Sequence, residues 1–342
     1  MPTGQAGKHM PRGPLNRRNF ISCLGGAAAW PLAARAQQAG KLWRIGFVSG
    51  AVRPPALESS IYAGLSHGMR QLGYVEGKDF VIEYRFAEGK YERFDDFAGE
   101  LVRLKADAIV LATAAAVRAM QKATDAIPIV MGYSTDPVGN GFVASLARPG
   151  GNTTGLASSS DDASPKQLEL LAMTIPNLSR VGLLVNPDSP NYLPVLKNAM
   201  TASQKAGMTL VSVEARNPEE VETAFAALRR ENVGAILVVS DGFLLSQRQR
   251  IAQLALRERL PSMFQQREFA EVGGLMSYGE SLLEFYRRAA SYVDKIFKGA
   301  QPGDLPIEQP ARFNLVINRN TADALGITIP SQVYVFADEV IE

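Results

Sequence analysis

Cysteine and histidine are scarce in this chain, whose 342 residues include one cysteine and two histidines. The cysteine, Cys23, lies in an N-terminal segment of unusual composition, so the rest of the chain has no thiol for a disulfide or a thiolate site. His67 is the one histidine beyond that segment. We expect it within a helix, packed or facing solvent, because a catalytic base needs an orienting partner. These counts argue against a Cys/His metal site and a Ser-His-Asp triad.

Cofactor and nucleotide fingerprints are also missing. The chain has no GxxxxGKS or GxxxxGKT phosphate loop and no GxGxxG after its first expected strand. Paired carboxylates occur at Asp95-Asp96 and Asp161-Asp162, in segments of surface-type composition where solvated faces are expected. We therefore expect no cofactor, no metal ion and no catalytic residue, and an enzyme that uses carboxylates alone is kept as an alternative.

Residues 1–36 have the composition of an export signal. They contain five basic residues and no acidic residue, and Arg17-Arg18 followed by Asn-Phe-Ile fits a twin-arginine signal. An apolar run of small residues over 21–34 leads to Ala34-Arg35-Ala36, an A-x-A cleavage site. We expect a cleaved twin-arginine signal peptide over residues 1–36 and a periplasmic protein.

A membrane helix and a lipoprotein are the alternatives for this segment. The apolar run is too short for a membrane span, which needs ~20 residues. Cys23 precedes the apolar run, whereas a lipoprotein cysteine follows it. Translation starts at Met1 or at Met10, and the long basic region leaves both open.

Removal of the signal changes the charge of the chain. Without the five basic residues, 31 of the 36 basic residues remain against 34 acidic ones, for a net charge of about −3 in place of +2. No basic patch remains to favour nucleic acid as a partner. The length exceeds the ~250–300 residues at which a single hydrophobic core stops growing, so the chain is expected to form two lobes.

Strands and helices alternate along the chain in two series. Strands are expected at 42–48, 80–86, 108–111 and 127–131 and, after a connecting run at 153–156, at 181–185, 209–213, 235–239, 262–264 and 275–277. Helices are expected at 59–72, 91–104, 113–122, 218–230, 244–259 and 282–297, with another ending near 206. This alternation predicts right-handed βαβ units and an α/β fold with parallel sheets in two halves.

Small polar residues follow several of these strands, where parallel α/β sheets bind their ligands. Thr113 and Ala114 open a helix after a buried strand, so free N–H groups there suit an anion such as a carboxylate, and capping by Thr113 is the alternative role. Ser134 and Asp136 follow the next strand. In the second half, Asn186 offers an amide, and Asp241 offers a carboxylate for a ligand ammonium. Capping of a helix near Leu244 is the alternative for Asp241.

The sequence DPVGNGFVASLARPGGNTTG, at residues 136–155, resembles a fingerprint of the bacterial ABC-transporter substrate-binding proteins in the family of tryptophan- and tyrosine-type binders. Further matching pieces are RIGFVSG (44–50), GLSHGMRQLGYVEGKDFVIEYRFAEG (64–89), SYG (277–279), YRRAASYVDKIFKGAQPGDLPIEQP (286–310) and FNLVINRNTADALGITIP (313–330). Together they cover nearly all of the chain beyond the signal.

The resemblance implies the type I periplasmic binding protein fold, with two Rossmann-like lobes joined by three hinge crossings. It implies an N-terminal lobe of residues 41–156 plus about 278–305, and a C-terminal lobe of residues 157–277 plus about 306–342. It also implies a small, often amino-acid-like solute held between the lobes and an ABC permease as partner, and we expect a monomer. The ligand contacts carried over position by position are Ser49, Gly50, Thr113, Ala114, Ser134, Asp136, Asn186, Asp241 and Tyr278.

Three alternatives accompany this interpretation. Tyr133 or Tyr278 could stack on a ligand ring or pack at the hinge. A ligand-sensing module that presents its closed form to a membrane receptor would have the same sequence features as a transport protein. A transcriptional regulator of this architecture would need a helix-turn-helix before its first strand, where this chain has the export signal.

Overall fold

The computed structural model describes residues 41–158, 163–189, 192–310 and 312–342. The expected signal peptide and the Asp161-Asp162 pair lie outside these ranges. Residues 43–342 form one compact unit that contains two separate β-sheets. No helix in the described part of the chain has both the length and the apolar character needed to cross a membrane.

The first sheet has five strands in the order β2-β1-β3-β4-β5, and all of its pairs are parallel. The strands are β1 (Trp43–Ser49), β2 (Phe80–Phe86), β3 (Ala108–Leu111), β4 (Ile129–Thr135) and β5 (Thr153–Ser158). The four residues of β3, AIVL, are all buried, as expected of a central strand covered on both faces. This arrangement confirms the predicted βαβ pattern of the first half.

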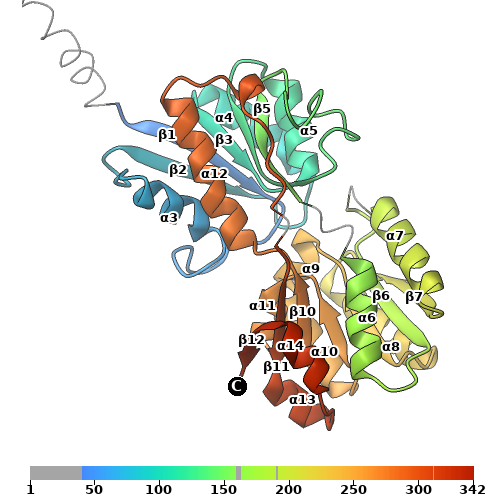
Figure 1. The fold of residues 1–342 in the computed structure, drawn as a ribbon. Coiled ribbons are helices and arrows are strands. Elements are labelled where there is room, and N and C mark those ends of the chain that lie inside the picture. The colour runs from blue at the N-terminus through green and yellow to red at the C-terminus, as the bar shows by residue number, and fades with distance from the viewer. Residues whose placement is uncertain (1–40, 159–162, 190–191, 311) are drawn as a thin grey trace, which may run out of the picture. The chain divides into compact units, whose positions relative to one another are not determined.

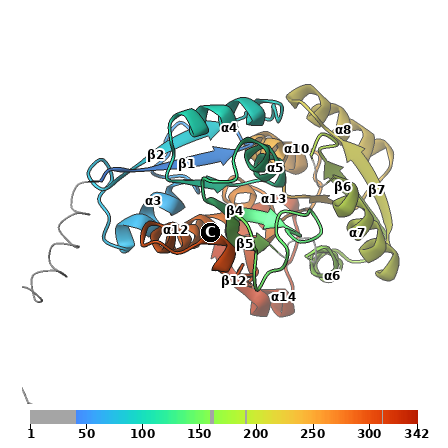
Figure 2. The same cartoon turned by 90° about the horizontal axis from the view of Figure 1, so that it is seen from above.

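Helices cover both faces of the first sheet (Figure 2). One face is covered by α4 (Arg93–Arg103) and α5 (Ala114–Ala123), and the other by α3 (Ala63–Gln71) and α12 (Leu282–Phe297). The α3 and α12 helices approach closely because two glycines of α3 lie at their crossing. A Cβ atom on Gly64 or on Gly68 would come within 2.4 Å of a backbone oxygen of α12. A segment late in the sequence thus packs against the first sheet.

The second sheet has seven strands in the order β12-β11-β10-β9-β8-β6-β7. The strands are β6 (Arg180–Val185), β7 (Thr209–Glu214), β8 (Ala235–Val238), β9 (Ser262–Phe264), β10 (Met276–Gly279), β11 (Asn314–Asn318) and β12 (Ala337–Ile341). The accompanying helices are α6 (Ser164–Thr174), α7 (Tyr192–Lys205), α8 (Pro218–Arg230), α9 (Gly242–Ser246), α10 (Arg248–Arg257), α11 (Arg267–Glu271), α13 (Arg319–Leu325) and α14 (Ser331–Phe336). Figure 1 shows these elements grouped around their own sheet.

One pair in the second sheet is antiparallel, which the strand–helix alternation did not predict. The chain leaves this sheet at the carboxyl end of β10, forms α12 against the first sheet, and returns through a short 3₁₀ helix, η2 (Pro302–Asp304), to β11. Because it returns from the side on which it left, β11 has to run opposite to β10. The topology of the crossing therefore sets the direction of this strand.

Two helices differ from their expected ranges. The helix expected over 59–72 begins at Ala63, because Ser60 forms turn hydrogen bonds, donating to the Leu57 carbonyl at 2.7 Å and accepting from the Tyr62 N–H at 3.3 Å. The helix expected over 244–259 is divided at Gln247 into α9 and α10, and its first turn begins at Gly242. That earlier start places Asp241 directly before a helix.

Candidate functional site

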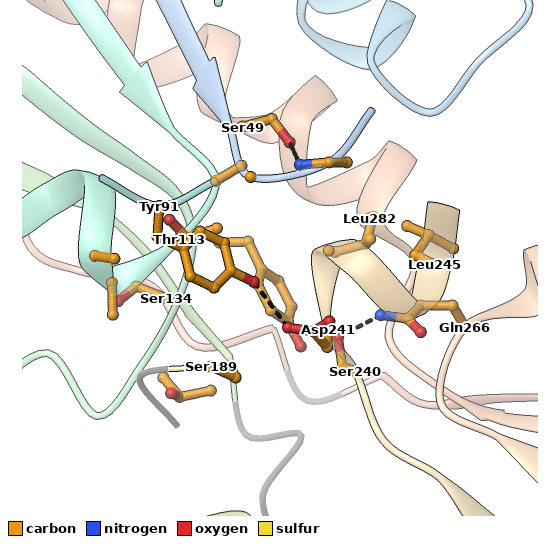
Figure 3. A pocket seen from close by; sticks show the side chains of 18 of the residues that line it. Ser49, Tyr91, Thr113, Ser134, Ser189, Ser240, Asp241, Leu245, Gln266 and Leu282 are labelled. Atoms are coloured by element: carbon orange, nitrogen blue, oxygen red, sulfur yellow. Dashed lines mark hydrogen bonds between the residues drawn. The ribbon is translucent and has the colours of Figure 1, made fainter. Parts of the chain in front are cut away.

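A cavity lies where the carboxyl ends of β1, β3 and β4 meet the loops that follow β6, β8 and β9 (Figure 3). Its volume is about 80 Å³, several times the ~10–15 Å³ that one water molecule needs. Both sheets contribute residues to its lining. This is the position at which open α/β sheets bind ligands, since the helix N-termini and the loops after the strands converge there.

The N-terminus of α5 forms one part of the wall. Thr113 caps the helix, and its Oγ1 accepts a hydrogen bond from the Ala116 N–H at 3.2 Å. Thr113, Ala114 and Ala115 all line the cavity. The first N–H groups of a helix have no partner within the helix and carry the positive end of its dipole. Capping by Thr113 and an anion site at Ala114 and Ala115 are therefore compatible.

Small residues complete the wall on the side of the first sheet. The Ser134 hydroxyl is buried and has no hydrogen-bond partner among the described residues. The Ser49 Oγ accepts from the Ala51 N–H at 3.2 Å, which fixes the turn after β1. A Cβ atom on Gly50 would lie 2.8 Å from the ring of Tyr91, so only glycine allows that ring to pack against the turn.

Asp241 supplies the charge on the side of the second sheet. It caps α9, and its Oδ1 accepts from the Leu244 N–H at 3.0 Å and from the Asn186 Nδ2 at 3.2 Å. Its Oδ2 accepts from the Tyr91 hydroxyl at 2.9 Å, a contact that joins the two halves of the cavity (Figure 3). Asp241 is the one charged side chain among the described residues that line this cavity.

The ionisation states of Asp241 and Tyr91 depend on the burial of both side chains. Burial raises the pKa of the Asp241 carboxyl above its ordinary value of 3.8, and the hydrogen bonds that it accepts oppose this rise. Burial, together with the neighbouring Asp241 carboxylate, also raises the pKa of Tyr91, so the phenol stays protonated and donates its hydrogen bond. In the described part of the chain, no lysine, arginine or histidine pairs with Asp241. A cation from a ligand would lower the free energy of this buried charge.

The structure brings most of the predicted site residues together. Ser49, Gly50, Thr113, Ala114, Ser134 and Asp241 line the cavity. Asn186 lies behind Asp241, where it donates to the carboxylate and accepts from the Asp188 N–H at 3.1 Å. Tyr133 also lines the cavity, and its ring packs edge-to-face on Phe285 at 5.3 Å between ring centres.

Asp136 and Tyr278 lie outside the cavity lining. Asp136 is exposed, adopts a positive φ of 39°, and accepts a hydrogen bond from the Gly139 N–H at 2.8 Å, so it organises a turn. The ring of Tyr278 stacks on Phe313 at 5.4 Å, and its carbonyl accepts from the Gln167 side chain at 2.8 Å. Both residues are engaged in local structure, Asp136 in the loop after β4 and Tyr278 within β10.

Several lining residues were not among the predicted contacts. Ser240 and Gln266 each come two residues after the end of a strand, β8 and β9, so the strand-end rule that identified Thr113 would have found them. Tyr91 precedes α4 and reaches Asp241, a contact between residues 150 positions apart. Four further lining residues come from helices and loops whose meeting has no local sequence signal, namely Tyr62, Leu245, Leu282 and Tyr286. In the described ranges, no cluster of three or more His, Cys, Asp or Glu side chains could hold a metal ion.

Comparison with known proteins finds relatives over nearly the whole compact unit. A family model described as "ABC transporter substrate binding protein" matches residues 47–341. A tyrosine-binding protein of Clostridioides difficile is 25% identical over 281 residues, which cover 82% of this chain and 80% of that protein.

Two solved structures have the same fold. One is the ABC domain in complex with L-Trp from Streptococcus pneumonia, with a TM-score of 0.79, 27% identity, and coverage of 88% of this chain and 100% of that chain. The other is a conserved domain protein from Vibrio cholerae, with a TM-score of 0.80, 29% identity, and the same coverage.

Proposed function

Because the chain belongs to the family of ABC transporter substrate-binding proteins, we propose that it captures a small, amino-acid-like solute between its two lobes and delivers it to an ABC permease. The interpretation of the fold as two lobes with parallel sheets agrees with the related structures. We propose residues 41–156 plus about 278–305 as one lobe, and residues 157–277 plus about 306–342 as the other.

The observation that supports this function best is the presence of opposite electrostatic features in one cavity. The α5 N-terminus offers unpaired N–H groups at Ala114 and Ala115, which suit a carboxylate. The buried Asp241 carboxylate has no cationic partner among the described residues and suits an ammonium. A zwitterion, with one carboxylate and one ammonium, satisfies both features at once, whereas a solute without charged groups leaves both unpaired.

We propose direct contacts from Ser49, Gly50, Thr113, Ala114, Ser134 and Asp241. Asn186 fixes the orientation of Asp241 through its 3.2 Å hydrogen bond. Asp136 shapes the loop after β4, and Tyr278 shapes the hinge, without touching the solute. Since the contacts come from both sheets, binding favours the closed arrangement of the lobes, which is the hinge closure that two-lobed binding proteins use.

L-Tyrosine and L-tryptophan are the first candidates for the solute. One relative is named for tyrosine, and another was solved with L-Trp. The cavity contains the tyrosines Tyr62, Tyr91, Tyr133 and Tyr286, whose rings suit an aromatic or otherwise apolar body. The protein changes no bond in the solute under this proposal.

We further propose that the protein acts in the periplasm as a monomer, after export by the signal expected at residues 1–36. Family members act outside the cytoplasm. N-terminal sequencing of the protein isolated from the periplasm tests the signal. The expected first residue is Gln37, and a chain that retains Arg17-Arg18 would contradict cleavage.

Native mass spectrometry of the protein purified from the periplasm tests the binding function. We expect a retained solute, released on denaturation, whose re-addition to the stripped protein raises the melting temperature. At a solute concentration of 100 times Kd, the stabilisation is about 2.7 kcal/mol. The absence of both a retained mass and a thermal shift across amino acids, their amides and small organic acids would contradict the proposal. Conversion of the bound compound during incubation would favour an enzyme.

Uptake measurements separate transport from sensing. Deletion of the gene should reduce uptake of the radiolabelled retained solute, and re-expression of the chain should restore it. Unchanged uptake, together with a lost transcriptional or chemotactic response to the same solute, would favour a sensor. A variant of the surface residue Lys205 serves as a control and should restore uptake like the wild type. Lys205 lies in the last turn of α7 and does not line the cavity.

A further inference from the structure

A second, larger cavity adjoins the first one. Its volume is about 860 Å³, within the ~300–1,000 Å³ that is typical of small-molecule sites. Most of its lining comes from the loop between β1 and α3 on one side, and from α9, α10 and α11 on the other. Ala51, Tyr62 and Leu245 line both cavities. The second cavity therefore lies next to the proposed solute site and, like it, is lined by segments that accompany both sheets.

Two arginines in the lining of the second cavity have no carboxylate partner. Arg53 belongs to the loop after β1, and its guanidinium carbon lies 5.9 Å from the centre of the Phe86 ring. Arg248 begins α10 and is partly buried, and its Nη1 donates to the Leu245 carbonyl at 3.2 Å. In the described ranges, neither guanidinium has a carboxylate within ion-pair distance. Each cation thus keeps N–H donors that a ligand can use.

Three carboxylates also line the second cavity among the described residues. Glu58 pairs with Arg70 at 3.1 Å, and Glu271 pairs with Arg267 at 2.9 Å. Glu268 is partly buried, and its burial, together with the neighbouring Glu271 carboxylate, raises its pKa to about 7. A large share of the Glu268 side chain is therefore protonated and uncharged at neutral pH. The charge that remains unpaired in this cavity is mainly positive.

We propose that the second cavity binds an anionic group, a phosphate or a carboxylate, between Arg53 and Arg248. A guanidinium directs two parallel N–H donors at such a group, and hydrogen bonds between ions are roughly twice as strong as neutral ones. Because the two arginines come from segments that accompany different sheets, an anion bound between them joins the two halves of the molecule. Its binding should favour the closed arrangement, as the solute in the first cavity does.

The anionic group can come from two sources. It is a free ion that binds independently of the first cavity, or it is the far end of a solute whose amino-acid end occupies the first cavity. The lining residues that the two cavities share place them side by side, which allows the second source. The site itself does not depend on the proposed function, because a free ion needs no amino acid in the first cavity.

Titration calorimetry with inorganic phosphate at constant ionic strength tests the site in the protein stripped of solute. We expect saturable binding to one site. Arg53→Gln and Arg248→Gln should each weaken it about 10- to 100-fold, as for a lost hydrogen bond to a charged group. Arg250→Gln is the matched control and should leave phosphate binding unchanged, since Arg250 belongs to the same helix as Arg248 and lines neither cavity.

O-Phospho-L-tyrosine distinguishes the two sources, because it carries a phosphate at the far end of an amino acid. If the site takes the far end of the solute, this compound should bind at least tenfold more tightly than L-tyrosine. Arg53→Gln and Arg248→Gln should abolish that gain, and Arg250→Gln should keep it. If the site takes a free ion, the phosphoryl group should give no gain, and saturating phosphate should raise the affinity for L-tyrosine.

Two results would overturn the proposal. One is the absence of phosphate binding together with no gain from the phosphoryl group of O-phospho-L-tyrosine. The other is binding of either compound that is equally tight in the wild type, Arg53→Gln and Arg248→Gln. Phosphate binding through the two arginines without binding of any amino acid would support the second site and contradict the proposed function alone. Since Arg53 is exposed, its variant decides even where Arg248→Gln does not fold.

Discussion

The two walls of the cavity differ in what they offer a ligand. The wall from the first sheet presents donors, namely the free N–H groups at the start of α5 and the Ser134 hydroxyl, and it has no charged side chain in the lining. The wall from the second sheet presents an acceptor, the Asp241 carboxylate. Under the proposed function, we therefore expect an amino acid to bind with its carboxylate toward the first wall and its amine toward the second.

The largest effect is expected from removing the charge of the second wall. Asp241→Asn keeps the oxygen that caps α9, places an amide nitrogen where the other oxygen accepts from Tyr91, and loses the negative charge. Binding of an amino acid should weaken by ~2–5 kcal/mol, about 30-fold to several thousand-fold. Titration calorimetry measures the loss, and Asp188→Asn, at an exposed carboxylate outside the cavity lining, is the matched control. Unchanged affinity would place the amine elsewhere.

A proline at the start of α5 tests the first wall. Ala114→Pro removes one backbone N–H at the first helical position, where proline is well tolerated, and the extended backbone of Thr113 suits a residue that precedes proline. The affinity for an amino acid should fall by ~1.5–3 kcal/mol, as for a lost hydrogen bond to a charged group.

The amide of the same amino acid serves as the control ligand for this variant. It lacks the carboxylate, so its affinity should change much less than that of the acid when Ala114 is replaced. Equal losses for acid and amide would mean that the proline blocks the cavity by its bulk. Retained affinity for the acid would mean that the carboxylate does not bind at α5.

Acidification should weaken binding through Asp241. Because burial raises the pKa of this carboxyl, the ligand-free protein takes up a proton above pH 3.8, and the neutral acid no longer attracts an ammonium. Below the raised pKa, the affinity should fall by up to about tenfold per pH unit. Calorimetry across this range measures the slope, and Asp241→Asn should remove it. A pH-independent affinity in the wild-type protein would contradict this role.

The stability of the ligand-free protein should change in the opposite direction. A carboxyl whose pKa is raised by folding binds more protons in the folded state than in the unfolded state. Its contribution to stability therefore increases as the pH falls from the raised pKa toward 3.8. Thermal unfolding of the wild type and of Asp241→Asn isolates this contribution. As the pH falls, the affinity should decrease while the stability increases. This opposite pH dependence distinguishes protonation of Asp241 from acid denaturation of the whole protein.

The smallest effect is expected from the contact between the walls. Tyr91→Phe removes the hydroxyl that donates to Asp241 at 2.9 Å. A hydrogen bond to a charged group contributes ~1.5–3 kcal/mol. Because the ligand amine competes for the same carboxylate, the affinity should change by no more than about tenfold. Small-angle X-ray scattering should show a larger radius of gyration for ligand-free Tyr91→Phe than for the ligand-free wild-type protein. A loss of affinity as large as that of Asp241→Asn would make Tyr91 a direct ligand contact.

The fold and the centre of the site follow from short-range patterns. The buried run of β3 and the polar residues after it identify a strand end, and parallel sheets bring such ends together, which places Thr113 and Ser134 in one cavity. Strands and helices alternate in both halves of the sequence, which predicted the α/β class, and the related structures confirm that class. The lobe boundaries and the ligand contacts stay predictions until a complex is measured.

Other features depend on contacts that the local sequence does not encode. Tyr91 and Leu282 reach the cavity only because distant segments pack together. The reversed direction of β11 follows from the route of the chain through α12, which periodicity does not record. Asp136 is a polar residue directly after a strand, as a site residue would be, but its carboxylate accepts a hydrogen bond from the Gly139 N–H in a tight turn. Local turn chemistry competes there with ligand binding for the same kind of side chain.

A thermodynamic cycle tests the orientation of the solute most directly. Calorimetry compares L-tyrosine with its desamino analogue, 3-(4-hydroxyphenyl)propanoic acid, on the wild-type protein and on Asp241→Asn. The account predicts a coupling energy of ~2–5 kcal/mol between the amine and the Asp241 charge. A coupling near zero, with both proteins losing the same affinity when the amine is removed, would contradict the assignment of the amine to the second wall.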